Sequence, residues 1–384
     1  MDLARDNVTK PKSKIRLLIL LANLAGGGAE RTAVRLLENL DRDIFEPKIG
    51  LLWGTGPFRE RVADGDLLLA DLPPLESTSY AALALKVPFV HLKMLKEFKP
   101  HVVMSLTASM NIATSLALAL YSRDKTGWVL REGNNTYRMI QDDLPNRWLA
   151  HLRKVVTGFA YRRADAILAI SHGLAQGLEE NFSIDRSRLH VIHNPVETSP
   201  LERRPAQEPR LLAIGRLEYQ KGFDLLLEAF AQLSNTSTRL TILGEGSQRQ
   251  ALEGQIAELG LQSRVDLPGF VSDLKPHLQK AHLFVLPSRW EGFGCVVIEA
   301  MAQGLPVVVT DCHYGPSEIV SDGVNGLVVK SESVAALAQG VTRVLEDPQW
   351  ADQLGREAIR RADDFAVERI VKEYEALWSR VVKR

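Results

Sequence analysis

The chain has 384 residues, more than one ordinary hydrophobic core organises, so two domains of roughly 150–200 residues are expected. Its 47 basic and 47 acidic residues give a net charge of zero, which argues against a protein that binds nucleic acid over its whole surface. Two cysteines, Cys295 and Cys312, are too few for a disulfide framework, so a reducing cytoplasm is expected.

The N-terminus begins with a polar stretch, and residues 1–13 are expected to form a disordered tail. The apolar run from Ile15 to Leu21 is too short to span a bilayer and leads directly into glycines. We therefore interpret it as a buried first strand and not as a signal peptide. Gly26, Gly27 and Gly28 then let the backbone approach a ligand closely, although a tight turn with positive φ explains them equally well.

Short apolar runs alternate with longer amphipathic stretches along most of the chain, which predicts βαβ units and parallel sheets. This rhythm stops at residues 193–210, where prolines and charged residues indicate an interdomain linker, and then restarts. The sequence predicts an α/β fold with domains at residues 1–195 and 196–365. An amphipathic helix in residues 366–384 is expected to pack back on the first domain.

Ligands of parallel sheets bind beyond the carboxyl ends of the strands, so the strand-to-helix loops are the candidate sites. In "GRLEYQKGFD", Arg216 ends a predicted strand and Lys221 precedes a helix, a pair of cations suited to phosphate. Solvated surface charge is the alternative interpretation. Gly244 in "LGEGSQ" either permits a close ligand approach or forms a turn.

Two glutamates in "PSRWEGFGCVVIEAMAQGLPVVVTD", Glu291 and Glu299, are eight positions apart. A helix is predicted from about Phe293 to Gln303, which places Glu291 in the loop and Glu299 on a largely buried helix. A glycosidase-type carboxylate pair, about 5–10 Å apart, is compatible with this spacing. A buried carboxylate needs hydrogen-bond donors, which a ribose diol or backbone N–H groups would supply.

Several motifs together resemble one family. The segments "GRLEYQKGFDLLLEAF", "LGEGSQ", "EGFGCVVIEA", "GLPVVVTD" and "GPSEIVSDGVNGLVV" resemble the donor-binding domain of the retaining GT-B glycosyltransferases of family 4, whose Glu-x7-Glu signature Glu291 and Glu299 match. "GGGAERTAVRLLENL" and "AISHGLAQGLEENF" extend the resemblance to nearly the whole chain. It implies two Rossmann-like domains with parallel sheets facing a central cleft. "TDCHYGPSEIV" is similar to members that transfer hexoses or N-acetylhexosamines from UDP in bacterial glycan assembly.

The resemblance also implies residue roles. Arg216 and Lys221 would hold the donor diphosphate and stabilise the charge on the leaving group without a metal ion. Glu299 would bind the ribose hydroxyls. Glu291, with the backbone around Phe293, Gly294, Cys295 and Val296, would contact the transferred sugar. The base would contact Gly269, Phe270 and Val271, and the nucleotide would contact Gly244. Gly27 and Gly28 would contact the phosphate and the sugar. The acceptor would attack from the front side, and the donor phosphate would take its proton.

One segment departs from the family pattern. Many members have a histidine after a first-domain strand, whereas this chain reads "GWVLREGNNTYR" in that region. Arg131 or Asn134 is expected to contact the sugar or the acceptor, and a structural cap or turn is the alternative.

The basic segment at residues 147–163 has no acidic residue and carries an apolar side, which favours a helix lying on an anionic membrane surface. Residues 85–99 form a second candidate. A core-facing helix with a basic edge is the alternative for both. The resemblance implies a glycan or lipid-linked acceptor, and a lipid-linked acceptor would favour the membrane interpretation. Peripheral attachment to the cytoplasmic face of the inner membrane is then the expectation.

Two other functional classes stay open at this level. One is a different enzyme on the same scaffold, such as an epimerase-like or phosphorylase-like protein, although no lysine is placed for a pyridoxal Schiff base. The other is a sugar-binding protein that has lost catalysis. The joint presence of Arg216, Lys221, Glu291 and Glu299 argues against that loss.

Overall fold

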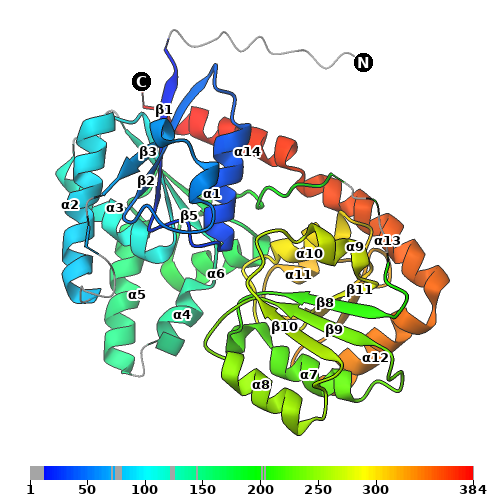
Figure 1. The fold of residues 1–384 in the computed structure, drawn as a ribbon. Helices are drawn as coiled ribbons and strands as arrows, with labels where there is room; N and C mark the ends of the chain where they lie inside the picture. Colours follow the sequence, from blue (N-terminus) through cyan, green and yellow to red (C-terminus); the bar gives the residue numbers. More distant parts are fainter. Residues whose placement is uncertain are drawn as a thin grey trace. The chain divides into compact units, whose positions relative to one another are not determined.

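The structure is a computed structural model and describes residues 13–70, 72–73, 80–121, 126–143, 146–199, 202 and 205–383. The expected disordered tail, residues 1–13, lies outside the described residues except for its last position. The chain divides into two compact units (Figure 1). Unit 1 comprises Met1–Leu168, Leu178–His190 and Val371–Arg384, and unit 2 comprises Ala169–Gly177 and Val191–Ile370. The domain limits expected from the sequence stay a prediction.

The first sheet has seven strands in the order β3-β2-β1-β4-β5-β6-β7. The strands are β1 (Ile15–Leu21), β2 (Phe45–Leu51), β3 (Leu67–Leu69), β4 (Val102–Leu106), β5 (Gly127–Glu132), β6 (Ala166–Ala169) and β7 (Leu189–Val191). The helices along this part of the chain are α1 (Gly28–Asn39), α2 (Tyr80–Phe98), α3 (Ala108–Leu120), α4 (Thr136–Asp143), α5 (Arg147–Tyr161) and α6 (His172–Phe182). Short 3₁₀ turns lie at Arg59–Arg61, Asp64–Asp66 and Arg186–Arg188.

β1 is an interior strand of this sheet, which explains its uninterrupted apolar sequence. It pairs in parallel with β2 and with β4, in the registers Ile15↔Phe45 and Leu17↔Val102. A central strand of a parallel sheet is covered on both faces, so its side chains need not alternate between apolar and polar. Every residue from Leu17 to Leu21 is buried, which confirms the predicted first strand.

The second sheet has six strands in the order β10-β9-β8-β11-β12-β13. The strands are β8 (Arg210–Ile214), β9 (Arg239–Leu243), β10 (Val265–Gly269), β11 (Leu283–Leu286), β12 (Val307–Asp311) and β13 (Leu327–Lys330). The helices along this part are α7 (Phe223–Ala231), α8 (Arg249–Glu258), α9 (Lys275–Lys280), α10 (Cys295–Met301), α11 (Pro316–Ile319), α12 (Val334–Glu346), α13 (Pro348–Ala362) and α14 (Val367–Val381). The 3₁₀ turns are η6 (Tyr219–Lys221) and η7 (Asp363–Phe365).

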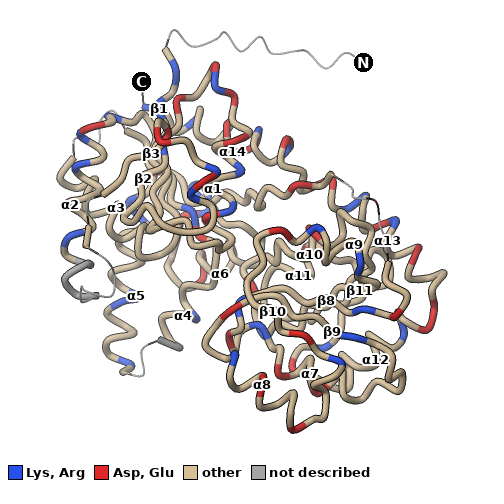
Figure 2. Tube along the Cα trace, in the orientation of Figure 1, with Lys and Arg blue, Asp and Glu red and all other residues tan. Residues whose placement is uncertain are grey.

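Leucine, isoleucine, valine and phenylalanine side chains from the sheet, α7, α8 and α12 form one buried cluster in unit 2. Figure 2 shows charged residues of both signs interspersed along the chain and not gathered by sign. This distribution agrees with the zero net charge.

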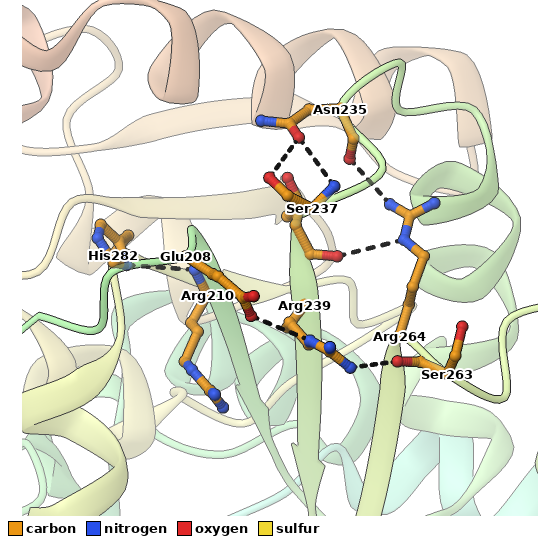
Figure 3. A network of polar contacts seen from close by, with 9 residues as sticks. Glu208, Arg210, Asn235, Ser237, Arg239, Ser263, Arg264 and His282 are labelled. Carbon is orange, nitrogen blue, oxygen red and sulfur yellow. Dashed lines mark hydrogen bonds and ion pairs between the residues drawn. The ribbon is translucent and has the colours of Figure 1, made fainter.

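Arginine side chains hold the starts of the unit 2 strands together (Figure 3). Arg239, at the start of β9, donates to Glu208 Oε2 at 3.2 Å. Arg264, just before β10, donates to the carbonyl oxygens of Thr238 at 3.2 Å and Asn235 at 3.1 Å. These bonds fix the amino-terminal edge of the sheet, so the opposite, carboxyl-terminal edge is the one available for ligands.

In both sheets the strand order reverses beside the first strand of the set. The reversal lies between β1 and β4 in the first sheet and between β8 and β11 in the second. Connections leave in opposite directions at such a point, which opens a crevice beyond the strand ends. The topology therefore predicts that ligands bind at the loops after β1, β8 and β11.

Candidate functional site

The reversal point in unit 2 brings Lys221 and Glu291 together. Lys221 ends the 3₁₀ turn after β8, and Glu291 lies in the loop after β11. The Lys221 Nζ and Glu291 Oε1 atoms are 2.6 Å apart, and the two side chains are 14% and 6% exposed. The ion pair thus lies in a largely dry position at the carboxyl edge of the sheet, where its charges are weakly screened.

A second donor contacts the same oxygen of the Glu291 carboxylate. Ser288 Oγ donates to Glu291 Oε1 at 2.7 Å, and Thr310 Oγ1 donates to the Ser288 carbonyl at 2.6 Å. Burial, and then the negative charge of Glu291, raise the pKa of the nearby Cys312 thiol to about 12. Two donors, the Lys221 ammonium and the Ser288 hydroxyl, hold the Glu291 carboxylate in place, as a ligand-binding carboxylate requires.

The loop that carries Lys221 is held by a residue that sequence reasoning did not single out. Arg289 donates to the Tyr219 carbonyl at 2.8 Å and pairs with both oxygens of Asp224, at 2.8 and 2.6 Å. Its guanidinium also lies 3.9 Å from the centre of the Tyr219 ring. Gln220 Nε2 donates to the Trp290 carbonyl at 2.8 Å. The only signal was an arginine two positions before Glu291, and surface exposure was the more ordinary expectation.

The structure leaves the predicted partner cation, Arg216, in solvent at the end of β8. Gly244, after the neighbouring strand β9, has φ +147°. A Cβ on Gly244 would lie 1.8 Å from the Gly215 carbonyl oxygen, so only glycine permits this close approach of two strand ends. Exposure leaves the Arg216 guanidinium available to an anion.

Three predicted base contacts lie at the carboxyl end of β10 and directly after it. Gly269 has φ +92°, and a Cβ there would lie 2.7 Å from Glu245 Oε1. Phe270 is 45% exposed and Val271 is half-buried. An exposed phenylalanine at the carboxyl edge of a sheet offers a surface on which a planar ring can stack.

The helix that carries Glu299 is shorter than the sequence predicts. α10 spans Cys295–Met301 and not Phe293–Gln303, because its N-cap, Gly294, has φ +99° and breaks the helical backbone. Phe293 is buried in the turn, and Cys295 Sγ accepts a hydrogen bond from Asn194 Nδ2 at 2.9 Å. Glu299 is 6% exposed on the fifth residue of α10, and Val296 precedes its buried face.

The predicted residues of unit 1 fall into two groups. Gly27 and Gly28 are exposed at the start of α1, as a backbone ligand site requires. Arg131 is 1% exposed and its Nε donates to the Tyr374 hydroxyl at 3.1 Å, which favours the structural alternative for this arginine. Asn134 is half-buried and its Oδ1 accepts from the Asn135 N–H at 2.9 Å, which is turn geometry.

A buried carboxyl lies beside these residues and was not assigned a role. Glu132, at the end of β5, accepts hydrogen bonds from the Tyr161 hydroxyl and from the Gly133 N–H. Burial raises its pKa, and the hydrogen bonds from Tyr161, Thr136 and the backbone oppose that shift. The side chain is enclosed by its own partners, so we assign it to the architecture of unit 1.

The basic helix α5 presents its apolar side chains to solvent. Trp148 is 68% exposed and Phe159 is 58% exposed. The other exposed apolar residues on this helix are Leu149, Leu152, Val155 and Val156. Its buried side consists of Thr157, Gly158, Ala160 and Tyr161. The alternative of a core-facing apolar side is therefore wrong for α5. In α2, Leu85 and Phe89 are exposed, but Met94 and Leu95 belong to the core.

Within the described part of the chain, no helix combines the length and the apolar character that crossing a bilayer requires. The two parallel sheets, each with a glycine-rich or charged loop at its reversal point, define a protein of the doubly wound α/β class.

Comparison with known proteins narrows this class. Residues 197–361 match the family described as glycosyl transferases group 1, and residues 26–200 match glycosyltransferase family 4. The chain is 29% identical over 364 residues to the Campylobacter jejuni N-acetylgalactosamine-N,N'-diacetylbacillosaminyl-diphospho-undecaprenol 4-alpha-N-acetylgalactosaminyltransferase, covering 93% of this chain and 98% of that protein. It is 31% identical over 195 residues to the lipopolysaccharide core biosynthesis glycosyltransferase LpsE of Rhizobium meliloti, covering 49% and 56%.

Among solved structures, Anabaena HepE in complex with UDP and glucose superposes with a TM-score of 0.80 at 21% identity, over 95% of this chain and all of that one. The chain belongs to the glycosyltransferases of the group 1 and family 4 type and has the GT-B fold. The resemblance stated from the motifs is confirmed in these terms.

Proposed function

We propose that the protein transfers a hexose or N-acetylhexosamine from a nucleotide sugar, a UDP-sugar, to a glycan or lipid-linked acceptor, with retention at the anomeric carbon. The observation that carries the proposal is the Lys221–Glu291 ion pair at the reversal point of the unit 2 sheet, 2.6 Å long and oriented by Ser288. Ligands of open parallel sheets bind at such a point.

In this proposal the donor diphosphate contacts Lys221 and the exposed Arg216. Two cations stabilise the negative charge that accumulates on phosphate as the glycosidic bond breaks, so the transfer needs no metal ion. Front-side attack then lets the departing phosphate accept the proton of the acceptor hydroxyl. Neither Glu291 nor Glu299 acts as a general base in this scheme.

The two glutamates take separate roles. The hydrogen bonds from Lys221 and Ser288 both fall on Glu291 Oε1, so Oε2 faces the position of the transferred sugar in our scheme. Glu299 on α10 accepts hydrogen bonds from the ribose diol. The base lies against Gly269, Phe270 and Val271.

We further propose that the acceptor is carried at the cytoplasmic face of a membrane, on which α5 lies. The exposed apolar stripe from Trp148 to Phe159, with Arg153 and Lys154 on the same helix, supports an anionic lipid surface as its occupant. The Campylobacter relative, by its name, acts on a sugar linked through diphosphate to undecaprenol.

The experiment is a donor screen. The protein is incubated with UDP-glucose, UDP-galactose and their N-acetylated counterparts, with and without a bacterial lipid extract, and released UDP and product anomer are measured. UDP release that depends on the extract supports transfer. Sugar conversion without UDP release would support an epimerase-like enzyme, and binding without turnover would support a non-catalytic relative.

Variants link the activity to the proposed residues. Arg216→Gln changes an exposed side chain, and Lys221→Gln keeps a donor for Glu291 while removing the charge. Each is expected to lower turnover by on the order of 10²-fold, as loss of one electrostatic contact to a transition state does. The exposed Lys275→Gln is the matched control. Near-normal turnover in Arg216→Gln and Lys221→Gln contradicts the phosphate role.

A further inference from the structure

Two histidines and a glutamate gather in unit 2 outside the ion pair described above. His172 is the first residue of α6, His193 follows β7, and Glu318 lies in α11. Their ligand-type atoms, the imidazole nitrogens and a carboxylate oxygen, all lie within 4.8 Å of one another. Three segments that are far apart in the sequence therefore present metal-ligand atoms to one point.

The His193 ring is held in the orientation that a ligand histidine requires. Its Nδ1 lies 2.9 Å from the Ile170 carbonyl oxygen, and because a carbonyl only accepts, Nδ1 carries the hydrogen. In the neutral ring the lone pair is then on Nε2. The ring is stacked on Phe293 at 4.7 Å and meets Phe365 edge-on at 5.2 Å. A backbone carbonyl on the second nitrogen is the usual support of a metal-bound histidine.

The Glu318 carboxylate is also oriented. Its two oxygens accept hydrogen bonds from the backbone N–H groups of His172, at 2.7 Å, and Gly173, at 2.8 Å. An ionised carboxylate has about four lone-pair positions, so these two bonds leave acceptor capacity for a cation. The same bonds hold Glu318 beside the residue that carries the third ligand, His172.

We propose that His172, His193 and Glu318 form a binding site for a transition-metal dication of the zinc type. Two imidazoles and one carboxylate are a donor set that zinc accepts, with a fourth position open to water. In a tetrahedral site with metal–ligand distances of about 2.0–2.2 Å, neighbouring ligand atoms lie about 3.4 Å from one another. His172 is exposed, so rotation of its side chain closes the difference.

The metal in this site joins the start of α6, the segment after β7 and α11. His193, in the segment after β7, stacks on Phe293, which precedes the Gly294 cap of α10. The role that follows is stabilisation of this part of unit 2. It is separate from the charge stabilisation assigned to Arg216 and Lys221, and the proposal does not depend on the transfer reaction.

The test is direct measurement of metal binding by the full-length, untagged protein after chelator treatment. Zn²⁺ is titrated in competition with a chromophoric chelator, and Co²⁺ is added separately to record its visible absorption. We expect one equivalent of Zn²⁺ to bind and to raise the midpoint of thermal unfolding. The Co²⁺ spectrum should lack the near-ultraviolet band of a cobalt–thiolate bond, which separates this site from one at Cys295 or Cys312.

The decisive variant is His172→Gln, because this side chain is exposed and its loss leaves the Glu318 bonds to the backbone in place. It should weaken Zn²⁺ binding at least tenfold and abolish the thermal shift. His277→Gln on α9 is the matched control and should bind as the wild type does. Absence of stoichiometric binding by the wild type, or equal affinity in His172→Gln, overturns the proposal. Neither result bears on UDP release.

Discussion

Lys221 and Glu291 are 70 residues apart in the chain and meet through one ion pair. The motifs identified both residues, because cations and carboxylates in strand-to-helix loops are typical of phosphate and sugar sites. They did not reveal that each residue orients the other. Nor did they identify Arg289, whose bonds to Tyr219 and Asp224 position the loop that carries Lys221. Such contacts depend on which loops the sheet places side by side.

A residue-scale prediction concerns His91, which is fully buried on α2 with its Nδ1 3.1 Å from Thr114 Oγ1. Burial lowers the pKa of His91 from 6.5 to about 3. The unfolded chain therefore binds one more proton between these values, so stability is complete above about pH 6.5 and is lost as the pH falls toward 3. The slope from this residue is at most about 1.4 kcal/mol per pH unit.

The measurement is urea unfolding from pH 7.5 to 4.5 for the wild type and His91→Gln. The stability of the wild type relative to His91→Gln should fall by up to about 2–3 kcal/mol between pH 6.5 and 4.5, since only the wild type loses this contribution. His151→Gln, at an exposed position on α5, controls for the loss of a histidine. A difference that stays constant with pH contradicts a buried neutral His91.

At the scale of elements, α5 departs most from the ordinary rule that apolar side chains face the core. Its buried side consists of small and polar residues together with Tyr161, while Trp148, Leu152 and Phe159 are exposed. α3 packs against both α5 and α2, so the exposed helix is firmly attached to unit 1. An apolar side of this extent on a fixed helix indicates a binding surface.

We predict that the wild type sediments with vesicles containing phosphatidylglycerol and binds phosphatidylcholine vesicles weakly. Trp148→Ser with Phe159→Ser should reduce binding to anionic vesicles at least tenfold, since each aromatic ring contributes on the order of 1 kcal/mol or more when buried. Arg153→Gln with Lys154→Gln should remove much of the preference for anionic lipid, about 1 kcal/mol per charge.

Val324→Ser in unit 2 removes another exposed apolar residue and should leave vesicle binding unchanged. The alternative is that the exposed apolar side of α5 binds a second copy of the chain. Light scattering measures the mass of the protein in solution and therefore detects such a dimer. A dimer that Trp148→Ser and Phe159→Ser dissociate, together with no vesicle binding, would refute the membrane assignment.

At the scale of the whole molecule, the chain returns to unit 1 at its C-terminal end. Residues from Val371 onward belong to unit 1, and Trp378 is fully buried there, 5.9 Å from the Phe45 ring and 5.3 Å from the Tyr374 ring. Residues of α14 therefore pack into a core to which β2 also contributes. Unit 1 is built from three segments that are separated along the sequence.

We expect Trp378→Ala to lower the stability of the protein by about 3–5 kcal/mol, because it removes a large buried ring. Trp378→Phe is the matched control. Among the described residues, no hydrogen-bond partner lies within reach of Trp378 Nε1, so phenylalanine loses no bond and should cost less than half as much. Urea unfolding of the full chain measures both, and equal effects of the two substitutions would contradict a tightly packed Trp378.

Much of the fold could be predicted because its signals are local. The alternation of apolar runs and amphipathic stretches predicts parallel sheets, and β1 and α14 lie where their patterns place them. The limits of an element depend on more than its apolar pattern. α10 begins two residues later than predicted, because the positive φ of Gly294 is a backbone property that apolar periodicity does not encode.

The sequence by itself determined the fold class, the family motifs and the two glutamates, because residue type and spacing along one chain carry that information. Only the tertiary structure decided which of these residues meet. It paired Glu291 with Lys221, enclosed Arg131 beside Tyr374, turned the apolar side of α5 outward and gathered His172, His193 and Glu318. The physical reason is that strand order and helix packing determine the contacts between residues far apart in the chain.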